Sequence, residues 1–497
     1  MDFVGQLSAR AAENPNEIAI DFPEGSCSYL QLERLVWRCV EMAIRNGVRR
    51  GDRVGLSFND ERLVLIFALA ITRLGAAITL IPPANPKEQK QEVIREAGLA
   101  LFYTDHPDPM KMDIPLLIIT YQDIETFGVG KEINLPRPDG SDLFVIHHGS
   151  GSTGKPKLLP CTHRQMSSLC YWQQRRYGSQ PGDIWASLVF LGFRTPLIHA
   201  LSAVTGGNRY VRSLTYLELE DMLTYCNELP VSYLSATPSQ VHRILNATPK
   251  DMKLRLPNLK GLVVSFAAVT PALRAEIAER LTPNLFISYG TNEVGVMTIL
   301  PPNVESSHDC SVGFPIDKNE IQIVDGKDTV VPAETPGLIR VRNDQHFEGY
   351  LGSQKDSDRV VRDGWFYPGD TGMLMPDGQL VHLGRADHMM IYRGVNIFPA
   401  EIEQVVSQLP GVDDVAAVPI HHPEWQDLPV CTFTLKPGYE DTPNKIAEAA
   451  GAKLGLRCPH WFLPLRSIPR NEQGKLDRAT LNEIIRQALK TAPGAAD

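Results

Sequence analysis

The stretch HHGSGSTGKP, residues 147–156, combines glycines with hydroxyl side chains and a lysine. Gly149 and the Gly154-Lys155 pair have the spacing of a P-loop, which cradles nucleotide phosphates. A P-loop continues with Ser or Thr to ligate magnesium, whereas this chain has Pro156, which offers neither a hydroxyl nor a backbone N–H. Pro156 therefore disfavours a P-loop triphosphatase, and leaves open a phosphate loop of another kind or a linker that binds nothing.

Length and composition restrict the class of protein. The chain has 497 residues, which is more than one core usually holds, so we expect at least two domains. The net charge of −9 disfavours binding to nucleic acid or to anionic membranes, because both need a basic surface. The first twenty residues lack the basic start and apolar core of a secretory signal. Eight scattered cysteines without a CxxC pair indicate reduced thiols rather than disulfides or a zinc site, so we expect a cytoplasmic protein.

One apolar segment, residues 63–83, is long enough to cross a bilayer. Arg73 lies in its middle, and Pro82 and Pro83 close it. A buried helix that ends near Leu74, followed by a buried strand, explains this pattern better than a membrane span. We expect no stable membrane insertion.

Apolar runs of strand length alternate with helical stretches over about residues 1–310. This alternation predicts an α/β region with ligands at the carboxyl ends of its strands. Thr270 and Pro271 are typical of the cap and first turn of a helix. Buried parallel strands are expected at residues 142–148, 231–237, 261–267 and 284–290.

The pattern changes twice in the second half of the chain. From about 311 to 385, short runs between Gly, Pro, Asn and Asp predict a small antiparallel, barrel-like sheet. From 386 to 497, helical and strand-like runs predict a compact α+β domain. We therefore predict a mixed α/β protein with a large N-terminal domain, residues 1–385, and a small mobile C-terminal domain, residues 386–497.

Five stretches occur in an order that is specific as a set. SGSTGKPK (150–157), SYGTNE (288–293), GWFYPGDTG (364–372), GRADHMMIYRGVNIFPAEIE (384–403) and PRNEQGKLDR (469–478) resemble motifs of the adenylate-forming enzyme superfamily. That superfamily includes acyl- and aryl-CoA ligases, adenylation domains of peptide synthetases, and luciferase. The resemblance covers essentially the whole chain and is closest to the acyl- and aryl-CoA ligases. It implies that the opening stretch is a mobile loop that grips pyrophosphate.

The resemblance implies an ATP- and Mg²⁺-dependent enzyme that joins a small carboxylic acid to a thiol. The acid would attack the α-phosphorus of ATP and release pyrophosphate, and a thiol would then take the acyl group from the acyl-adenylate. The thiol would belong to CoA, which makes the chain an aryl- or acyl-CoA ligase. Two other interpretations stay open: an adenylation enzyme that loads a carrier protein on its phosphopantetheine arm, and a non-catalytic homologue that binds a nucleotide or an acyl group.

The resemblance also assigns roles to single residues. Lys475 would be the main catalytic cation, bridging the carboxylate of the acid and the α-phosphate. Glu293 would act with it and hold Mg²⁺. Asp370 would accept hydrogen bonds from the ribose hydroxyls, and Arg385 would contact ribose or phosphate. Asp387 would be the hinge about which the C-terminal domain turns.

The remaining nucleotide-binding residues would surround the adenine and the phosphates. Tyr289 would stack beside the adenine, and Gly290 would let the backbone approach closely. Asn292 stands where the family usually has Thr, so the phosphate contact at this position is open, and Thr291 would share it. The phosphate loop would be formed by Ser150, Ser152, Thr153, Gly154 and Lys157.

An acyl pocket is expected from the resemblance near residues 190–197, 263–268 and 288–297. Phe193 falls near the position where amino-acid-activating relatives carry an aspartate, which disfavours an α-amino acid. Phe266, followed by Ala267, stands where relatives usually have glycine; its ring would shorten the pocket and favour an aryl or small acyl acid, unless it is a repacked core residue. Arg194 would pair with a second carboxylate of the substrate or with a CoA phosphate, or point to water as a surface arginine.

Overall fold

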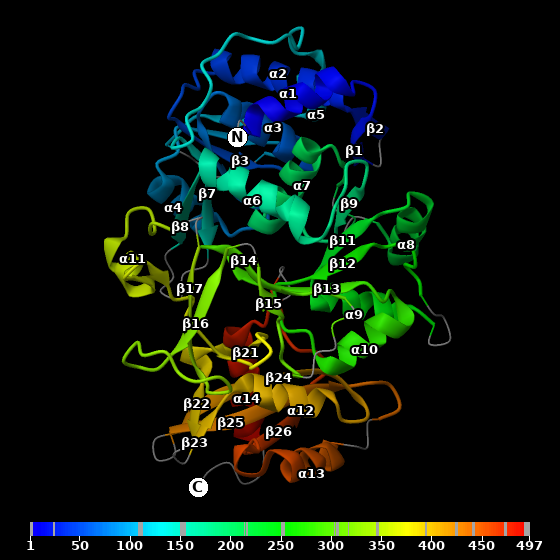
Figure 1. The fold of residues 1–497 in the computed structure, drawn as a ribbon, viewed down its shortest axis with the longest axis vertical. Coiled ribbons are helices and arrows are strands. Elements are labelled where there is room, and N and C mark those ends of the chain that lie inside the picture. The colour runs from blue at the N-terminus through cyan, green and yellow to red at the C-terminus, as the bar shows by residue number, and fades with distance from the viewer. Residues whose placement is uncertain are drawn as a thin grey trace.

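The computed structural model describes residues 3–22, 25–107, 113–149, 156–212, 214, 217–249, 254–302, 304, 308–316, 318–343, 347–392, 395–422, 426–439, 443–471 and 475–491. Within these residues the chain forms four β-sheets. The molecule is elongated, with the N-terminal part at the top of Figure 1, the β-rich part below its middle and the C-terminal part at the lower end.

The largest sheet has nine strands in the order β15-β14-β13-β12-β11-β9-β10-β1-β2. Its central strands, from β13 to β1, are parallel, and β2, β14 and β15 are antiparallel at its two ends. The strands are β1 Ile18–Phe22, β2 Gly25–Ser28, β9 Ile184–Ser187, β10 Arg209–Val211, β11 Tyr233–Ala236, β12 Gly261–Val264, β13 Leu285–Thr291, β14 Gly295–Leu300 and β15 Phe314–Pro315.

The second sheet has six strands in the order β6-β5-β3-β4-β7-β8, and only β8 is antiparallel to its neighbour. The strands are β3 Arg53–Ser57, β4 Ala77–Leu80, β5 Leu101–Thr104, β6 Leu116–Ile118, β7 Leu143–Gly149 and β8 Lys157–Thr162. β7 and β8 form the hairpin that carries the opening stretch, with Gly149 opposite Lys157. A P-loop leads into a helix, so the strand at β8 confirms that the likeness to a P-loop is one of spacing only.

Helices α1 to α10 accompany the two sheets, and α11 packs against β18 of the β-rich part. They are α1 Phe3–Glu13, α2 Tyr29–Arg45, α3 Glu61–Arg73, α4 Lys87–Ala97, α5 Tyr121–Thr126, α6 His163–Arg176, α7 Arg194–Gly206, α8 Leu219–Glu228, α9 Pro238–Ala247, α10 Pro271–Arg280 and α11 Gln354–Val360. The Thr270 hydroxyl accepts a hydrogen bond from the backbone N–H of Leu273, which confirms the predicted cap of α10.

The apolar segment 63–83 forms α3 and β4, as predicted. Arg73 is only 4% exposed. Its guanidinium lies 2.9 Å from the Glu33 carboxylate and 4.6 Å from the centre of the Trp37 ring. A buried charge needs such a partner, and the pair explains why an arginine is tolerated in this segment. Of the helices that the structure describes, none is both long and apolar enough to cross a membrane.

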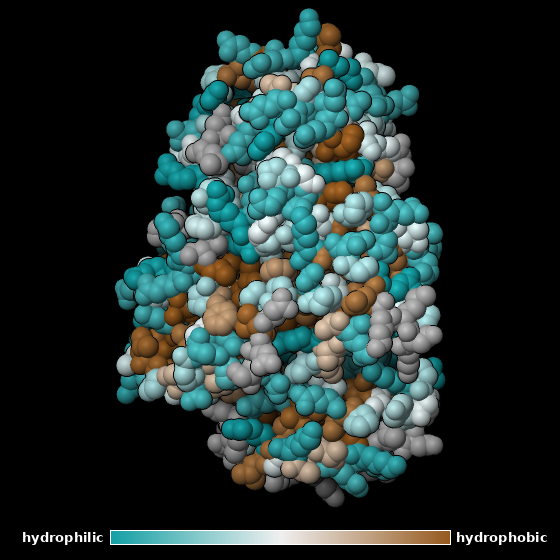
Figure 2. Space-filling view, turned by 45° about the vertical axis from the view of Figure 1, so that its right-hand side comes forward, coloured by the Kyte–Doolittle hydropathy of each residue, from teal (hydrophilic) through white to brown (hydrophobic). Residues whose placement is uncertain are grey.

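The β-rich part is an antiparallel sheet, as predicted, in the order β18-β19-β17-β20-β21, with β16 paired to β17. Its strands are β16 Glu320–Val324, β17 Gly337–Arg342, β18 Val361–Arg362, β19 Trp365–Phe366, β20 Asp370–Leu374 and β21 Leu380–Arg385. On the face shown in Figure 2, hydrophobic side chains reach the surface in a band at mid-height, the level at which Figure 1 places β14 and β17.

The C-terminal part has its own sheet, in the order β23-β22-β25-β24, with β26 paired to β25. Its elements are η2 Ala386–His388, β22 Met390–Tyr392, β23 Val395–Ile397, α12 Pro399–Ser407, β24 Val412–His422, β25 Gln426–Leu435, α13 Pro443–Leu454, η3 Gly455–Arg457, β26 Trp461–Pro464 and α14 Arg478–Thr491. A separate hydrophobic core, which includes Ile397, Ile402 and Phe433, holds this part together. The predicted mixed α/β fold with a large N-terminal and a small C-terminal domain is confirmed, and the predicted boundaries at 310 and 385 stay predictions.

The C-terminal domain packs directly against the β-rich sheet. Phe398 joins a hydrophobic cluster with Val381 and Leu383 of β21. Gln404 on α12 accepts a hydrogen bond from the Cys310 thiol, with 3.2 Å between Sγ and Oε1, and donates one to Asp309. These contacts hold the C-terminal domain, and with it the loop that carries Lys475, against the rest of the molecule in this structure.

Candidate active site

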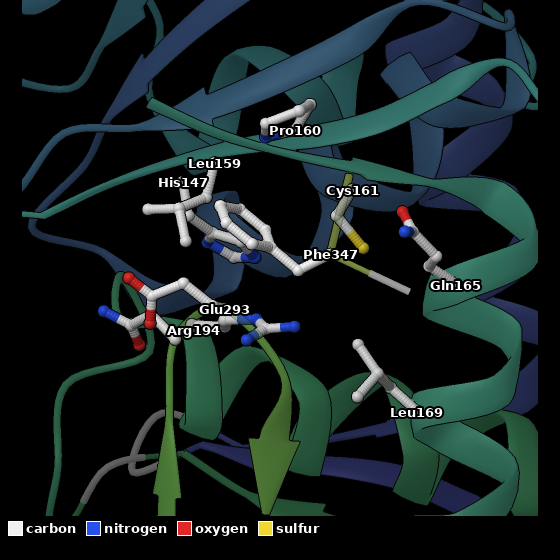
Figure 3. Close-up of a pocket in the computed structure, with 10 residues that line it drawn as sticks. His147, Leu159, Pro160, Cys161, Gln165, Leu169, Arg194, Glu293 and Phe347 are labelled. Atoms are coloured by element: carbon white, nitrogen blue, oxygen red, sulfur yellow. The ribbon is translucent and has the colours of Figure 1, made fainter. Parts of the chain in front are cut away.

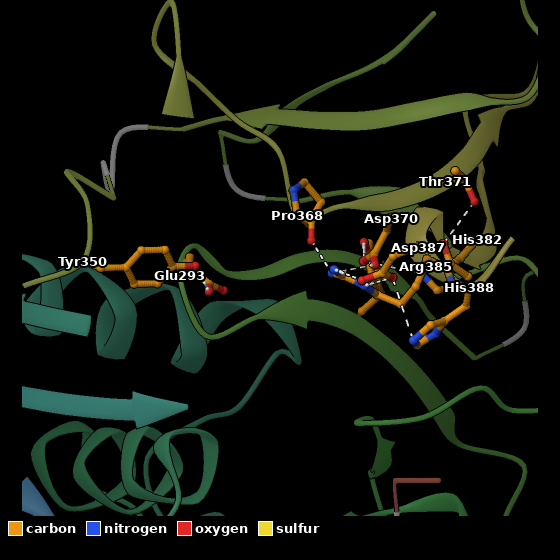
Figure 4. Close-up of polar contacts among 11 residues, drawn as sticks. Glu293, Tyr350, Pro368, Asp370, Thr371, His382, Arg385, Asp387 and His388 are labelled. Carbon is orange, nitrogen blue, oxygen red and sulfur yellow. Dashed lines mark hydrogen bonds and ion pairs between the residues drawn. The ribbon is translucent and has the colours of Figure 1, made fainter. Parts of the chain in front are cut away.

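One end of the site is built on the β20–β21 hairpin, whose register places Asp370 opposite Arg385. Arg385 Nη1 lies 3.5 Å from Asp370 Oδ1, and the Tyr289 hydroxyl donates to Oδ2 at 2.5 Å. His382 Nε2 also lies 3.5 Å from Oδ2 (Figure 4). Burial acts to raise the pKa of Asp370, but its contacts with His382, Tyr289 and Arg385 outweigh burial and lower that pKa. The buried carboxylate is therefore an anion at neutral pH.

Tyr289 and Gly290 lie in β13, at the point where its pairing with β14 becomes irregular. The Tyr289 ring centre is 4.7 Å from that of His382, and burial raises the pKa of the tyrosine. The register of the β13–β14 pair shifts between Tyr289 and Gly290, and a Cβ added to Gly290 would lie 2.2 Å from the Gly295 carbonyl oxygen. The structure therefore explains Gly290 by this strand pairing, whereas the predicted contact of both residues with a nucleotide stays a prediction.

The short helix η2 connects the β-rich sheet to the C-terminal domain. Asp387 in this turn accepts hydrogen bonds from Arg385 Nε at 3.1 Å and Nη2 at 3.3 Å. Burial, helped by the charge of Arg478 at the start of α14, lowers the pKa of His388 to about 4. Charged groups of both domains thus meet at Asp387, the predicted hinge, and its role as a hinge stays a prediction.

Glu293 lies in the turn between β13 and β14. Its Oε1 accepts a hydrogen bond from the Tyr350 hydroxyl at 2.7 Å (Figure 4). Lys157, at the end of the opening stretch, holds its Nζ 4.9 Å from the centre of the Tyr350 ring. The structure thus brings the foot of the phosphate loop to Glu293. The predicted loop residues Ser150, Ser152, Thr153 and Gly154 lie outside the described residues.

Lys475 comes to the site from the C-terminal domain. Its backbone N–H donates to Asn471 Oδ1 at 3.0 Å, which holds the residue within its loop. Burial lowers the pKa of Lys475, while the negative charges of Glu293 and Asp370 act in the opposite direction. Lys475 therefore lies within electrostatic reach of both carboxylates, and three segments far apart in the sequence converge on one place.

A narrow pocket lies beside Glu293, between β7, β8, α6 and α7 (Figure 3). Arg194, the first residue of α7, lines this pocket, and its Nη1 lies 3.4 Å from the Thr291 carbonyl oxygen. Burial lowers the pKa of Arg194, and the charge of Glu293 opposes the shift. Arg194 is half-buried and lines the pocket, which disfavours the interpretation as a surface arginine that points to water, and its contact with a substrate stays a prediction. Asn292 lines the same pocket.

The other predicted acyl-pocket residues lie elsewhere around the site. Phe193 is the residue before α7, and its ring packs edge to face against that of Phe190, with 6.2 Å between the ring centres. Phe266 has a φ of 77°, in the left-handed region. The predicted strand 261–267 is too long for this reason: β12 ends at Val264, because a strand cannot continue through such a residue. The contact of Phe193, Phe266 and Ala267 with the acid stays a prediction.

Sequence reasoning missed His382 and Tyr350. His382 lies three residues before Arg385, and simple alternation along a strand puts two such residues on opposite faces. The register of the hairpin shifts between Thr371 and Gly372, so that Leu383 is skipped in the pairing and both side chains reach Asp370. Tyr350 stands outside the quoted motifs, and its only signal is an aromatic residue in the glycine-flanked stretch EGYLG, residues 348–352.

The described residues contain no group of three or more His, Cys, Asp or Glu side chains that could hold a metal ion. A metal ion held by Glu293 would therefore take most of its ligands from the substrate and from water. Mg²⁺ suits such a site, because it prefers oxygen ligands and keeps several waters when bound. Oε2 of Glu293 has no hydrogen-bond partner in the part of the chain that the structure describes, so it could serve as that ligand.

Two family models match the chain: the AMP-binding enzyme over residues 7–351 and the AMP-binding enzyme C-terminal domain over residues 401–475. The chain belongs to the AMP-binding enzyme family. The predicted resemblance to the adenylate-forming superfamily is thereby confirmed. The two matched ranges also contain Glu293 and Lys475, which lie within electrostatic reach of each other.

Individual relatives are distant but match this AMP-binding enzyme over most of its length. A 2-succinylbenzoate–CoA ligase of Geobacillus sp. is 23% identical, over 96% of this chain and 97% of the relative. One of the plipastatin synthase proteins of Bacillus subtilis is 25% identical over 96% of this chain, which corresponds to 13% of that relative. The crystal structure of ATP-bound MatB from Rhodopseudomonas palustris shares the fold, with a TM-score of 0.89, 19% identity and coverage of 98% of this chain and 99% of that one.

Proposed function

We propose that this AMP-binding enzyme is an acid–thiol ligase that forms an acyl-adenylate from ATP and a carboxylic acid and transfers the acyl group to CoA. The observation that supports the proposal is the approach of Lys475 to both Glu293 and Asp370. A carboxylate and the phosphates of ATP are both anions, so a cation is needed where they meet. An ammonium on a loop of the smaller domain suits this task.

In the first half-reaction, the carboxylate of the acid attacks the α-phosphorus and pyrophosphate leaves. Lys475 would bridge the incoming carboxylate oxygen and the α-phosphate oxygens as a point charge. Lys157 lies at the foot of the predicted phosphate loop and would draw the leaving phosphates. Asp370 is already an anion and would accept hydrogen bonds from ribose hydroxyls, because each carboxylate oxygen can accept more than one.

Glu293 would contribute one oxygen to Mg²⁺, which neutralises phosphate charge when bound. The Tyr350 hydroxyl donates to Oε1 and so fixes the rotation of the carboxylate. Tyr350 would therefore act as a positioning residue that leaves Oε2 for the ion.

In the second half-reaction, the sulfur of a thiol attacks the acyl carbon, and AMP leaves. No bond to phosphorus forms in this step, so Lys475 would contribute less to it. A turn of the C-terminal domain about Asp387 would withdraw Lys475 and open a path for the thiol.

The experiment mixes the enzyme with ATP, Mg²⁺, CoA and, one at a time, aryl, short, medium and dicarboxylic acids. The proposal expects acid-dependent pyrophosphate exchange into ATP, and AMP and an acyl-CoA among the products identified by mass. Neither exchange nor AMP with any acid would contradict the proposal and support the interpretation as a non-catalytic homologue.

A second candidate acceptor is the phosphopantetheine arm of a carrier protein. It is favoured by the match to a part, 13%, of a much longer plipastatin synthase protein. Both acceptors present the same thiol, so the same reaction is run with a phosphopantetheinylated carrier protein in place of CoA. A mass increase of the carrier protein, with no acyl-CoA formed in the parallel reaction, would show that the acceptor is the carrier protein and not CoA.

A further inference from the structure

The pocket beside Glu293 contains two buried polar nitrogen atoms that lack a partner in the part of the chain that the structure describes. They are Nε of Arg194 and Nε2 of His147, and both residues line the pocket. His147 is 7% exposed. Polar atoms that are shielded from water are almost always hydrogen-bonded in native proteins, so two such atoms in one pocket indicate a group that binds there.

The charged group that points into this pocket is positive. In Figure 3 the Arg194 guanidinium points into the space framed by Phe347, Gln165 and Leu169, while the Glu293 carboxylate points away from it. Glu293 acts on the charge of Arg194 from a distance, and the two residues form no ion pair. A second arginine, Arg176 on α6, lies near enough for its positive charge to lower the pKa of Arg194. The group that fits here is therefore an anion.

We propose that this pocket binds a second carboxylate of the acid substrate, so that the enzyme activates a small dicarboxylic acid and Arg194 pairs with the carboxylate that does not react. This inference rests on the proposed function. Nη1 of Arg194 faces the Thr291 carbonyl, which leaves Nε and Nη2 as the parallel pair of donors that matches a carboxylate. His147 would donate a further hydrogen bond when its Nε2 carries the proton.

The position of Glu293 explains how one molecule could reach both cations. The charge of Glu293 acts on both Arg194 and Lys475, so both cations lie within electrostatic reach of this one carboxylate. A short acid lying past Glu293 would present one carboxylate to Arg194 and the other to Lys475. Leu159 and Phe347 supply apolar walls for its carbon skeleton. A long fatty chain does not fit this arrangement, because it would bury Arg194 without a partner.

The test compares matched acids in the pyrophosphate exchange assay. Succinate, glutarate and benzene-1,3-dicarboxylate are each paired with their own half-amide, which keeps the shape and the reacting carboxylate and removes the second charge. The proposal expects at least one diacid to be used with a kcat/KM about 30-fold or more above that of its half-amide, because truncating one partner of a buried charge pair costs about 2 kcal/mol or more. Equal use of diacids and half-amides, or use of acids with a single carboxylate alone, would overturn it.

Two variants then assign the effect to Arg194. Arg194→Met should lose the preference for the diacid over its half-amide, and Arg194→Lys should keep part of it. Arg175→Met is the control, because Arg175 is an exposed arginine on the same helix as Arg176, and it should keep the preference. A preference that survives in Arg194→Met would overturn the role of Arg194. Absence of exchange with every acid in the unaltered enzyme would instead contradict the proposed function.

Discussion

Asp370 and Arg194 are charged groups that both contact β13, at Tyr289 and at Thr291, yet their surroundings differ. Both oxygens of Asp370 face donor groups, from Tyr289, His382 and Arg385. Arg194 has one long hydrogen bond to a backbone carbonyl, and its Nε is a buried atom without a partner among the described residues. The Asp370 side is thus arranged before any substrate binds, whereas the Arg194 side is completed only by the substrate. We infer that the Asp370 side recognises what is constant in the reaction and that the Arg194 side recognises what is particular to this enzyme.

Removing Asp370 should have the largest effect on stability. Asp370→Ala leaves the Tyr289 hydroxyl without its acceptor and Arg385 without its buried partner, which should lower the free energy of unfolding by about 2–3 kcal/mol. Denaturant unfolding measures this loss, and titration calorimetry should show weaker ATP binding. Asp358→Ala, at an exposed position on α11, is the control. Unchanged stability together with unchanged ATP binding would show that Asp370 does not belong to the part of the site that is arranged before substrate binds.

Tyr350→Phe tests the same side with a smaller change. The variant loses only the hydroxyl that donates to Glu293, and a hydrogen bond to a charged group contributes about 1.5–3 kcal/mol. The Mg²⁺ concentration for half-maximal exchange should therefore rise about tenfold or more. Tyr439→Phe, at an exposed tyrosine, should leave it unchanged. An unaltered Mg²⁺ dependence in Tyr350→Phe would show that Tyr350 does not position Glu293.

The Arg194 side should give the protein a characteristic pH dependence. Burial lowers the pKa of His199 on α7 from 6.5 to about 3. Below pH 6.5 the unfolded chain binds a proton at His199 that the folded chain does not, so stability falls as the pH drops from about 6.5 towards about 3. Each such histidine contributes up to ~1.4 kcal/mol per pH unit. His199→Leu should flatten the plot of unfolding free energy against pH, and an equal slope in both proteins would contradict this.

Removing the charge of Arg194 should have the smallest effect on stability. Arg194→Met takes away a half-buried guanidinium that forms no ion pair with the described residues, and keeps most of the side-chain volume. The free energy of unfolding should therefore change by less than about 1 kcal/mol, or rise. The contrast with Asp370→Ala is the direct test of the comparison. A loss of stability as large as that of Asp370→Ala would mean that Arg194 is a structural residue.

The predictability of the site follows the same division. Glu293, Asp370, Arg385 and Lys475 are carried by motifs, and the structure brings all four together, because the fold fixes where each motif ends. For Arg194 the sequence left three interpretations open, because the local sequence does not show that α7 begins next to the Thr291 carbonyl, at a pocket that β7 and β8 also line.

Local irregularities of the backbone account for further misses. His382 joins Asp370 only because the β20–β21 register shifts, which alternation along the strand cannot reveal. Phe266 has the backbone conformation that favours glycine, which explains why glycine is expected at this position. The large elements were predictable, since their apolar periodicity reflects the sheets and cores in which they lie.

The central claim is that Lys475 brings the two anionic reactants together. Its most direct test is acid-dependent pyrophosphate exchange by Lys475→Ala, with Lys453→Ala on α13 as the control and ATP binding measured in parallel. The account predicts a loss of exchange of about 10²–10³-fold, the effect of removing one preorganised charge donor, with ATP still bound and with a smaller loss when synthetic acyl-adenylate and CoA are supplied. Exchange at the level of the unaltered enzyme in Lys475→Ala would contradict it.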